Sequence, residues 1–210
     1  MTKVTCQISI SLDGFVAGPS QSMDNPIGEG GMRLHEWAFA TDTWNEQHGQ
    51  EAGSRTADSE VAAKMMEGVG AFIMGRNMFG PGRGAWDESW RGWWGEDPPY
   101  HAPVFVLTNH AREPLVMEGG TTFHFVDGFD AALAAATDVA GDLPIDIAGG
   151  ASVVRQAIAA GELDELTLGY APVALGSGER LFDGTITPTL EIIEGEQSAL
   201  ATHVRYRIVR

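Results

Sequence analysis

Three segments of the 210-residue chain place glycines and polar residues directly after stretches that predict β-strands. They are Gly75-Arg76-Asn77, Thr108-Asn109-His110 and Gly149-Gly150-Ala151-Ser152. Ligands bind outside the carboxyl ends of the strands in an open α/β sheet, and a helix that starts after a glycine pair favours a phosphate. Arg76 can also contact a phosphate through two parallel hydrogen bonds. Each signal is weak alone, but together they favour a site for an elongated cofactor that carries phosphates.

Alternating strands and helices position these segments. Periodicity and turn residues predict strands over residues 3–12, 71–75, 103–107, 121–126, 143–148, 163–170 and 172–175, and helices over 35–47, 59–67, 129–140 and 152–160. Asp58 is the predicted N-cap of the second helix. Residues 190–195 and 199–209 predict a hairpin of long strands, interrupted at 194–197. This order predicts an α/β fold, with a mostly parallel central sheet flanked by helices on both faces and an antiparallel C-terminal strand pair.

Composition bounds the class of protein and its partners. The 13 basic and 29 acidic side chains give a formal charge of −16, which disfavours nucleic acid and anionic membranes because their phosphates are repelled. A hydrophobic share of 43% with 20% charged residues is globular and argues against intrinsic disorder. No internal repeat or linker divides the sequence, so residues 1–210 predict a single domain.

Cysteine and histidine usage argues against a metal site. The single cysteine, Cys6, excludes an internal disulfide and a multi-cysteine zinc site, and it predicts a small core residue of the first strand. The six histidines show no metal-ligand spacing, so we predict no metal. With no apolar run near the roughly 20 residues of a membrane span, we expect a cytoplasmic protein.

Four motifs carry a family resemblance. They are ISLDGFVAG (residues 10–18), IMGRNMFG (73–80), VLTNHAREPL (106–115) and the long run over residues 147–182. In this order they resemble the dihydrofolate reductase-like family. They are most similar to stand-alone relatives of the C-terminal reductase domain of the bifunctional riboflavin-biosynthesis enzyme. The resemblance covers nearly the whole chain, and its most specific part is residues 149–182.

The resemblance implies a reduced nicotinamide cofactor across the strand ends, usually NADPH, with NADH as the alternative. Carried over by position, Val16 and Ala17 would touch the nicotinamide end. The residues near the phosphates and the adenosine ribose would be Gly75, Arg76, Asn77 and Met78. Those at the adenine end would be Leu107, Thr108 and Asn109. Those around the pyrophosphate would be Gly149, Gly150, Ala151, Ser152 and Val153.

Two positions depart from the family pattern near the phosphates. Met78 stands where many of these reductases have threonine or serine, and Ala151 stands where folate reductases often have a basic residue. The 2′-phosphate of NADPH would therefore depend on Arg76. Its candidate helpers are Asn109, His110 and Arg112.

Hydride transfer also requires a proton, and the sequence offers two acids near the expected site. Glu36, beside Trp37, is the predicted catalytic residue, because a partly buried carboxylic acid can donate a proton. The alternative is that Glu36 is an exposed carboxylate in the first turn of a helix. Asp13 precedes a glycine after the first strand and predicts turn chemistry. Ala148 replaces a carboxylate that riboflavin-pathway reductases commonly place before the glycine pair, which argues against the riboflavin precursor as substrate.

Four of the six tryptophans, Trp86, Trp90, Trp93 and Trp94, lie within nine residues. Such a cluster can form a lid or wall for an aromatic substrate. The alternative is that it packs on its own domain or at a dimer interface.

The predicted function is that of an NADPH-dependent oxidoreductase. It would reduce a small heteroaromatic substrate, pterin-like or pyrimidine-like, by hydride transfer. One alternative is a non-catalytic protein that binds a nucleotide or another small molecule, and another is a reductase that uses a flavin in the same cleft. The resemblance also implies a homodimer.

Overall fold

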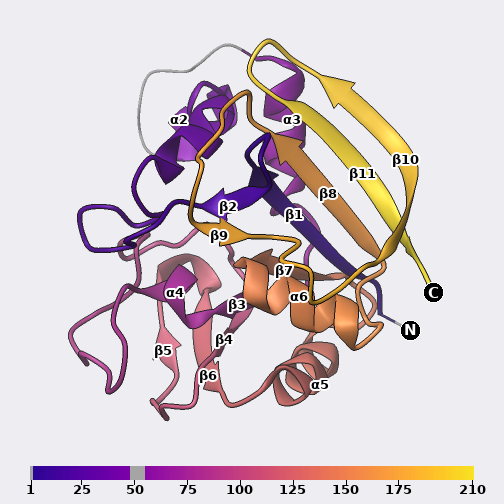
Figure 1. Cartoon of the computed structure of the whole chain (residues 1–210). Coiled ribbons are helices and arrows are strands. Elements are labelled where there is room, and N and C mark those ends of the chain that lie inside the picture. The colour runs from indigo at the N-terminus through magenta and orange to yellow at the C-terminus, as the bar shows by residue number, and fades with distance from the viewer. Residues whose placement is uncertain (1, 48–54) are drawn as a thin grey trace. The chain divides into compact units, whose positions relative to one another are not determined.

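The computed structural model describes residues 2–47 and 55–210 (Figure 1). These residues form two compact units. The first unit comprises Met1–Cys6 and Gly68–Leu163, and the second comprises Gln7–Glu67 and Asp164–Arg210. Strand β1 (Val4–Ile10) contributes residues to both units. The two units make up a single domain if they unfold together, so the single domain stays a prediction.

The first unit holds the parallel part of the sheet. Its other strands are β3 (Ala71–Gly75), β4 (Pro103–Leu107), β5 (Leu115–Val116), β6 (Thr122–Val126) and β7 (Ile145–Gly149). Their order is β1-β7-β3-β4-β6-β5, and every pair is parallel except β5 with β6. The carboxyl ends of β7, β3 and β4 therefore lie side by side at one edge of the sheet.

Apolar strands and small-residue helices build the core of the first unit. Strand β3 is buried over Ala71–Met74, which is the pattern of a strand covered on both faces. Helices α5 (Phe129–Ala140) and α6 (Ala151–Ala159) contact one another and β3. Two short elements complete the unit: α4 (Arg76–Phe79) directly after β3, and η2 (Glu118–Gly120).

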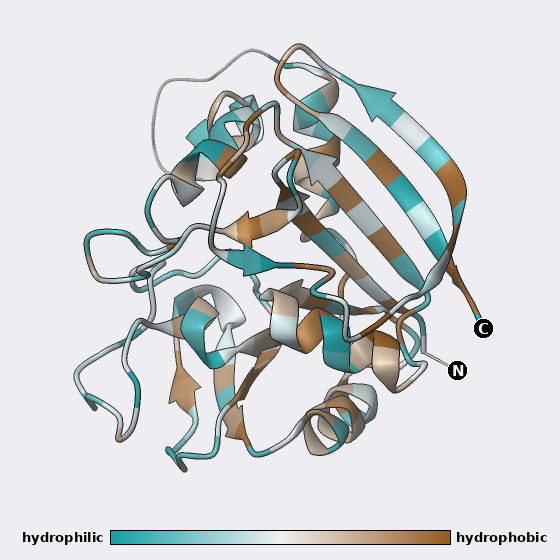
Figure 2. Ribbon diagram, in the orientation of Figure 1, coloured by the Kyte–Doolittle hydropathy of each residue, from teal (hydrophilic) through white to brown (hydrophobic). Residues whose placement is uncertain are grey.

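The second unit holds the antiparallel part. It contains β8 (Glu165–Tyr170), β10 (Thr189–Gln197) and β11 (Thr202–Val209) in the order β10-β11-β8-β1, with β10/β11 and β11/β8 antiparallel. Apolar and polar residues alternate along β11 (Figure 2). Strands β2 (Phe15–Ala17) and β9 (Glu179–Arg180) form a separate antiparallel pair. The mostly parallel sheet with an antiparallel C-terminal strand pair is confirmed.

The helix predicted over residues 35–47 is wrong as one element. The chain forms η1 (Gly31–His35), α1 (Glu36–Phe39) and α2 (Asp42–Gln47) instead. Thr41 causes the break, because its hydroxyl donates to the carbonyl of Ala38 at 2.7 Å and accepts from the amide of Trp44 at 3.1 Å. One side chain thus bonds the end of one helix and the start of the next.

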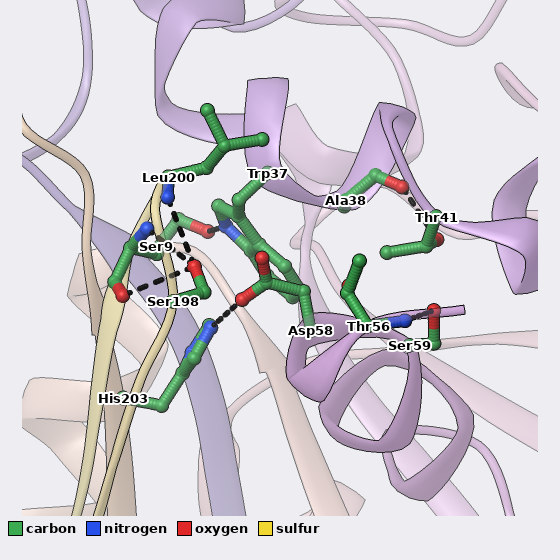
Figure 3. A network of polar contacts seen from close by, with 11 residues as sticks. Ser9, Trp37, Ala38, Thr41, Thr56, Asp58, Ser59, Ser198, Leu200 and His203 are labelled. Atoms are coloured by element: carbon green, nitrogen blue, oxygen red, sulfur yellow. Dashed lines mark hydrogen bonds and ion pairs between the residues drawn. The ribbon is translucent and has the colours of Figure 1, made fainter. Parts of the chain in front are cut away.

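The prediction that Asp58 is an N-cap is also wrong. Helix α3 spans Ala57–Lys64, and its N-cap is Thr56, whose amide donates to the hydroxyl of Ser59 at 3.0 Å. Asp58 is buried within the first turn, where its carboxylate accepts a hydrogen bond from His203 of β11 (Figure 3). A long-range partner, invisible to a local pattern, determines the role of this residue.

Two strand predictions near the C-terminus need correction. Residues 172–175 form no strand, because Pro172 has no amide hydrogen and the amides of Leu175 and Gly176 donate to the carboxylate of Asp13. Strand β10 is not interrupted at 194–197. It continues to Gln197 with a register shift between Ile192 and Glu194. The turn follows at Ser198, whose hydroxyl accepts from the amides of Leu200 and Ala201.

Within residues 2–47 and 55–210, no helix has both the length and the apolar character needed to cross a bilayer.

Candidate functional site

The ends of β3 and β4 are joined by a hydrogen bond between two residues of the predicted site. Arg76 follows β3, and its Nη1 donates to the hydroxyl of Thr108, just past β4, at 3.3 Å. Its Nε donates to the carbonyl of Gly82 at 2.9 Å. The guanidinium is therefore fixed between two strand ends and the loop that follows α4.

The end of β7 presents backbone beside the same strand end. Gly149 has φ +125°, a conformation that favours glycine, and the peptide bond to Gly150 is cis. A Cβ built on Gly75 would lie 3.2 Å from Cγ2 of Val153 and 3.7 Å from the nitrogen of Gly150. A side chain at Gly75 would press on Val153 by a few tenths of an ångström, so the close approach of β3 to the start of α6 favours glycine.

The start of α6 offers unused donors. Gly150 is its N-cap and provides no side-chain cap, and a Cβ built there would meet nothing within 4 Å. Among the described residues, no acceptor is hydrogen-bonded to the amides of Ala151 and Ser152. Free amides together with the positive end of a helix dipole are suited to an anion.

Charge at this edge also favours an anion. Burial lowers the pKa of Arg76, and the positive charge of Arg83 lowers this pKa further, so two cations lie near one another. In the described parts of the chain, neither arginine forms an ion pair with a carboxylate. Two guanidiniums without a carboxylate partner make this edge suited to an anion such as a phosphate or a carboxylate.

The tryptophan segment packs on aromatic residues of the first unit. Trp86 contacts Phe79 and Phe125, with ring centres 5.7 and 5.0 Å apart. Trp94 lies 5.1 Å from Tyr100. These contacts agree with the alternative that the tryptophan cluster packs on its own domain. They also place Trp86 beside Arg76, whose Cζ lies 3.7 Å from the centre of the Trp86 ring.

The other predicted residues divide between the two units. In the first unit, Asn77, Met78 and Leu107 are half-buried, Asn109 and Ser152 are exposed, and Ala151 and Val153 are buried. The structure thus brings the strand-end residues together there: Gly75, Arg76, Thr108, Gly149, Gly150 and Val153. Val16 and Ala17 lie in β2 of the second unit, and Glu36 begins α1 of that unit with an exposed side chain.

Sequence reasoning missed Arg83 and expected a different role for Arg112. A signal for Arg83 exists, because it lies in the loop Gly80-Pro-Gly-Arg-Gly84 that directly follows the predicted site. The Arg112 side chain is only 4% exposed, and its Nη2 donates to the carbonyls of Glu88 and Trp90 at 3.0 and 2.8 Å. Arg112 therefore fixes the tryptophan segment.

Asp13 performs the turn chemistry that its sequence predicts. Its carboxylate accepts from the hydroxyl of Ser11 at 2.6 Å and from the amides of Leu175 and Gly176 at 3.1 and 2.6 Å. The Ser11 hydrogen bond is the largest of the effects that lower the pKa of Asp13 to about 2. A carboxylate held in this way acts as an acceptor and organises the loop. Across the described residues, no group of three or more His, Cys, Asp or Glu side chains is arranged to hold a metal ion.

The sheet order and the three glycine-containing or polar strand ends define an α/β protein of dihydrofolate reductase-like fold. The chain belongs to the RibD C-terminal domain family, whose sequence model matches residues 2–204. This match confirms the resemblance of the four motifs.

Three solved structures illustrate the likeness. A provisionally named riboflavin biosynthesis protein from Shewanella sp. PV-4 is 22% identical, with a TM-score of 0.63 over 100% of both chains. A diaminohydroxyphosphoribosylaminopyrimidine deaminase/5-amino-6-(5-phosphoribosylamino)uracil reductase from Thermotoga maritima is 14% identical, with a TM-score of 0.56 over 99% of this chain and 57% of that one. Dihydrofolate reductase from Enterococcus faecalis, complexed with NADP(H), is 12% identical, with a TM-score of 0.51 over 98% and 96%. At these identities the likeness concerns the fold. No curated protein matches the chain significantly.

Proposed function

We propose that the protein is an NADPH-dependent reductase of a small heteroaromatic compound, pterin-like or pyrimidine-like. The observation that carries the proposal is the Arg76 guanidinium, which is held at the strand edge by Gly82 and Thr108, interacts with the positive charge of Arg83 and has no carboxylate partner among the described residues. Two relatives support the chemistry by their names, a uracil-compound reductase and a dihydrofolate reductase complexed with NADP(H). Ala148 still argues against the riboflavin precursor itself.

The donor set of the first unit fits a dinucleotide phosphate. The backbone at Gly149 and Gly150 and the amides of Ala151 and Ser152 would hold the pyrophosphate, and Arg76 with Arg83 would hold the 2′-phosphate. Reduced nicotinamide, when bound, supplies a hydride to the substrate. Leu107, Thr108 and Asn109 remain the proposed adenine contacts.

The contacts at the nicotinamide end rest on the family resemblance alone. We propose Val16 and Ala17 for these contacts and Glu36 for the proton. Glu36 is exposed, and its carboxylate has no ion pair or hydrogen bond with the described residues. Solvent therefore reaches this acid, and it would exchange its proton directly with water.

Calorimetric titration with NADPH and NADH tests the cofactor. A cofactor at 100 times its Kd adds about 2.7 kcal/mol to the free energy of unfolding, so a thermal shift gives a second measurement. We expect Arg76→Ala to weaken NADPH about 50-fold and NADH less than twofold, because charge-assisted hydrogen bonds to the 2′-phosphate are lost. The absence of binding by either nicotinamide would refute the proposal.

A non-catalytic binding protein is the second candidate, favoured by the exposure of Glu36. Oxidation of NADPH with any member of a panel of pterins and pyrimidines would exclude it. A yellow purified protein with a bound flavin would support the flavin-using reductase over both the NADPH-dependent reductase and the non-catalytic binding protein.

We further propose a cytoplasmic homodimer. The resemblance supports the dimer, and the single buried Cys6 suits a reducing compartment. Light scattering is expected to give twice the chain mass of 22.4 kDa. A particle of one chain mass at micromolar concentration would contradict the dimer.

A further inference from the structure

Arg76 rests on an aromatic face. Its Cζ lies 3.7 Å from the centre of the Trp86 ring, a cation–π contact at close range. With the hydrogen bonds of Nε to Gly82 and Nη1 to Thr108, three independent contacts hold the guanidinium. An exposed arginine without such contacts would sample many rotamers, each of which must be lost when an anion binds.

Trp86 is itself held from several directions. Its indole N–H donates to the carbonyl of His110 at 2.7 Å, in the segment that follows β4. Phe79 and Phe125 meet its ring edge to face, and Phe79 is fully buried. These contacts restrain the indole from several directions, so it can act as a platform for Arg76.

Arg112 strengthens this platform from below the surface. Its buried guanidinium lies 5.6 Å from the Trp86 ring centre and 5.1 Å from that of Phe125. Through Nη2 it also binds the carbonyls of Glu88 and Trp90, just after Trp86 in the chain. The backbone that carries Trp86 is thus tied to the aromatic core.

The remaining donors of Arg76 suit a phosphate. A guanidinium has five N–H donors, and the bonds to Gly82 and Thr108 use two of them, which leaves three. We propose that Trp86 is a positioning residue that orients Arg76 toward the 2′-phosphate and so determines the preference for NADPH over NADH. This inference rests on the proposed function, and it adds Trp86, which lies outside the four family motifs.

Loss of the Trp86 indole should affect the two cofactors differently. NADH has no 2′-phosphate, so its affinity does not depend on the orientation of Arg76. Loss of the indole face should therefore weaken NADPH and leave NADH almost unchanged. Trp93 provides a matched control, because it is a half-buried tryptophan of the same segment that contacts Trp90 and not Arg76.

Calorimetric titration of the full chain with NADPH and with NADH tests the inference. We expect Trp86→Leu to raise the Kd for NADPH about tenfold and the Kd for NADH less than twofold, because a cation–π contact is lost. We expect Trp93→Leu to leave the ratio of the two constants unchanged. Trp86→Phe, which keeps an aromatic face, should retain the ratio within about threefold.

A double-mutant cycle separates positioning from general damage to the fold. In an Arg76→Ala background, Trp86→Leu should cause no further loss of NADPH preference, because the group that it positions is gone. Thermal melting identifies any variant that fails to fold. If Trp86→Leu fails to fold, Trp86→Met, which also removes the aromatic face, takes its place in the cycle.

The outcomes distinguish the two proposals. Wild-type protein that binds neither cofactor refutes the proposed function. Wild-type protein that prefers NADPH, with a Trp86→Leu variant that weakens both cofactors equally, refutes the role of Trp86 alone. Additive losses in the cycle, or a Trp86→Phe variant as impaired as Trp86→Leu, would also overturn it.

Discussion

The Nε2 atom of His203 lies 2.9 Å from Oδ1 of Asp58, and both side chains are buried (Figure 3). The two residues are 145 positions apart, in β11 and α3. The ring of Trp37 stands edge-on to the imidazole at 4.6 Å and donates its N–H to Ser9 of β1 at 3.0 Å. These contacts therefore link helices α1 and α3 to strands β1 and β11 within the second unit.

Removing one member of the buried pair should be costly. We expect His203→Ala to lower the free energy of unfolding by about 3–5 kcal/mol, because the Asp58 carboxylate stays buried without its donor. Urea denaturation measures this change.

An exposed ion pair provides the control for this prediction. Arg207 lies 2.8 Å from Glu191, and both side chains are more than half exposed. Glu191→Ala should therefore cost less than about 1 kcal/mol. Replacing both buried partners, by Asp58→Leu with His203→Phe, should recover most of the loss. Equal losses at the buried and the exposed pair would contradict the argument.

Asp146 should make stability depend on pH. This buried residue of β7 has a pKa raised to about 7 by burial, against the opposing hydrogen bond from Thr5 at 2.9 Å. The folded protein therefore retains a proton that the unfolded chain loses near pH 4, so stability is complete below pH 4 and falls as the pH rises to about 7.

The test for Asp146 is a matched pair of substitutions. Asp146→Asn should raise the free energy of unfolding at pH 8 relative to wild type, by up to about 4 kcal/mol, and should change it little at pH 4. Asp142→Asn removes an equal charge from an exposed position and should show no such difference. An Asp146→Asn variant with the same pH profile as wild type would rule out this carboxyl as the cause.

Much of the fold was predictable because its determinants are local. Strand β4 and helix α5 have the predicted bounds, since each is a continuous apolar or alanine-rich run between clear turn residues. One error was local, because the hydroxyl of Thr41 bonds its neighbours and splits a predicted helix. The others occurred where residues distant in sequence decide: Asp58 is hydrogen-bonded to His203, and the segment 172–175 is held by Asp13.

The candidate site divides in the same way. Gly75, Arg76, Thr108 and the glycine pair were predictable, because parallel strands must end at one edge. The supporting residues were not, because Trp86 reaches Arg76 through an irregular loop that no periodicity describes. Arg112 is a basic residue in the region where a phosphate contact was expected. Its side chain is buried, however, and its hydrogen bonds go to backbone carbonyls.

Asp13 should order the segment around Leu175. Its lowered pKa, about 2, means that the bonds to the amides of Leu175 and Gly176 persist at neutral pH and are lost as the pH falls from about 4 toward 2. We expect Asp13→Asn to speed hydrogen exchange at both amides, measured by mass spectrometry at neutral pH. Asp183→Asn, in another loop, should leave them unchanged. Unaltered exchange in Asp13→Asn would show that other contacts hold the segment.

The two units should unfold together. Strand β1 pairs with β7 in the first unit through Val4 and Ile145, its neighbour on the other side in the sheet is β8, and its residues from Gln7 onward belong to the second unit, so the loss of either unit removes partners from a shared strand. Four of the six tryptophans lie in the first unit, so fluorescence reports mainly on that unit, whereas far-ultraviolet circular dichroism reports on both. Urea titrations by the two probes should therefore give one midpoint and one slope, the signature of a single cooperative domain. Trp44→Phe, which removes a second-unit fluorophore, should leave the fluorescence midpoint where it is. If the units are independent domains, the two probes will give separate midpoints, because the first unit can then lose its structure while the second retains its strands.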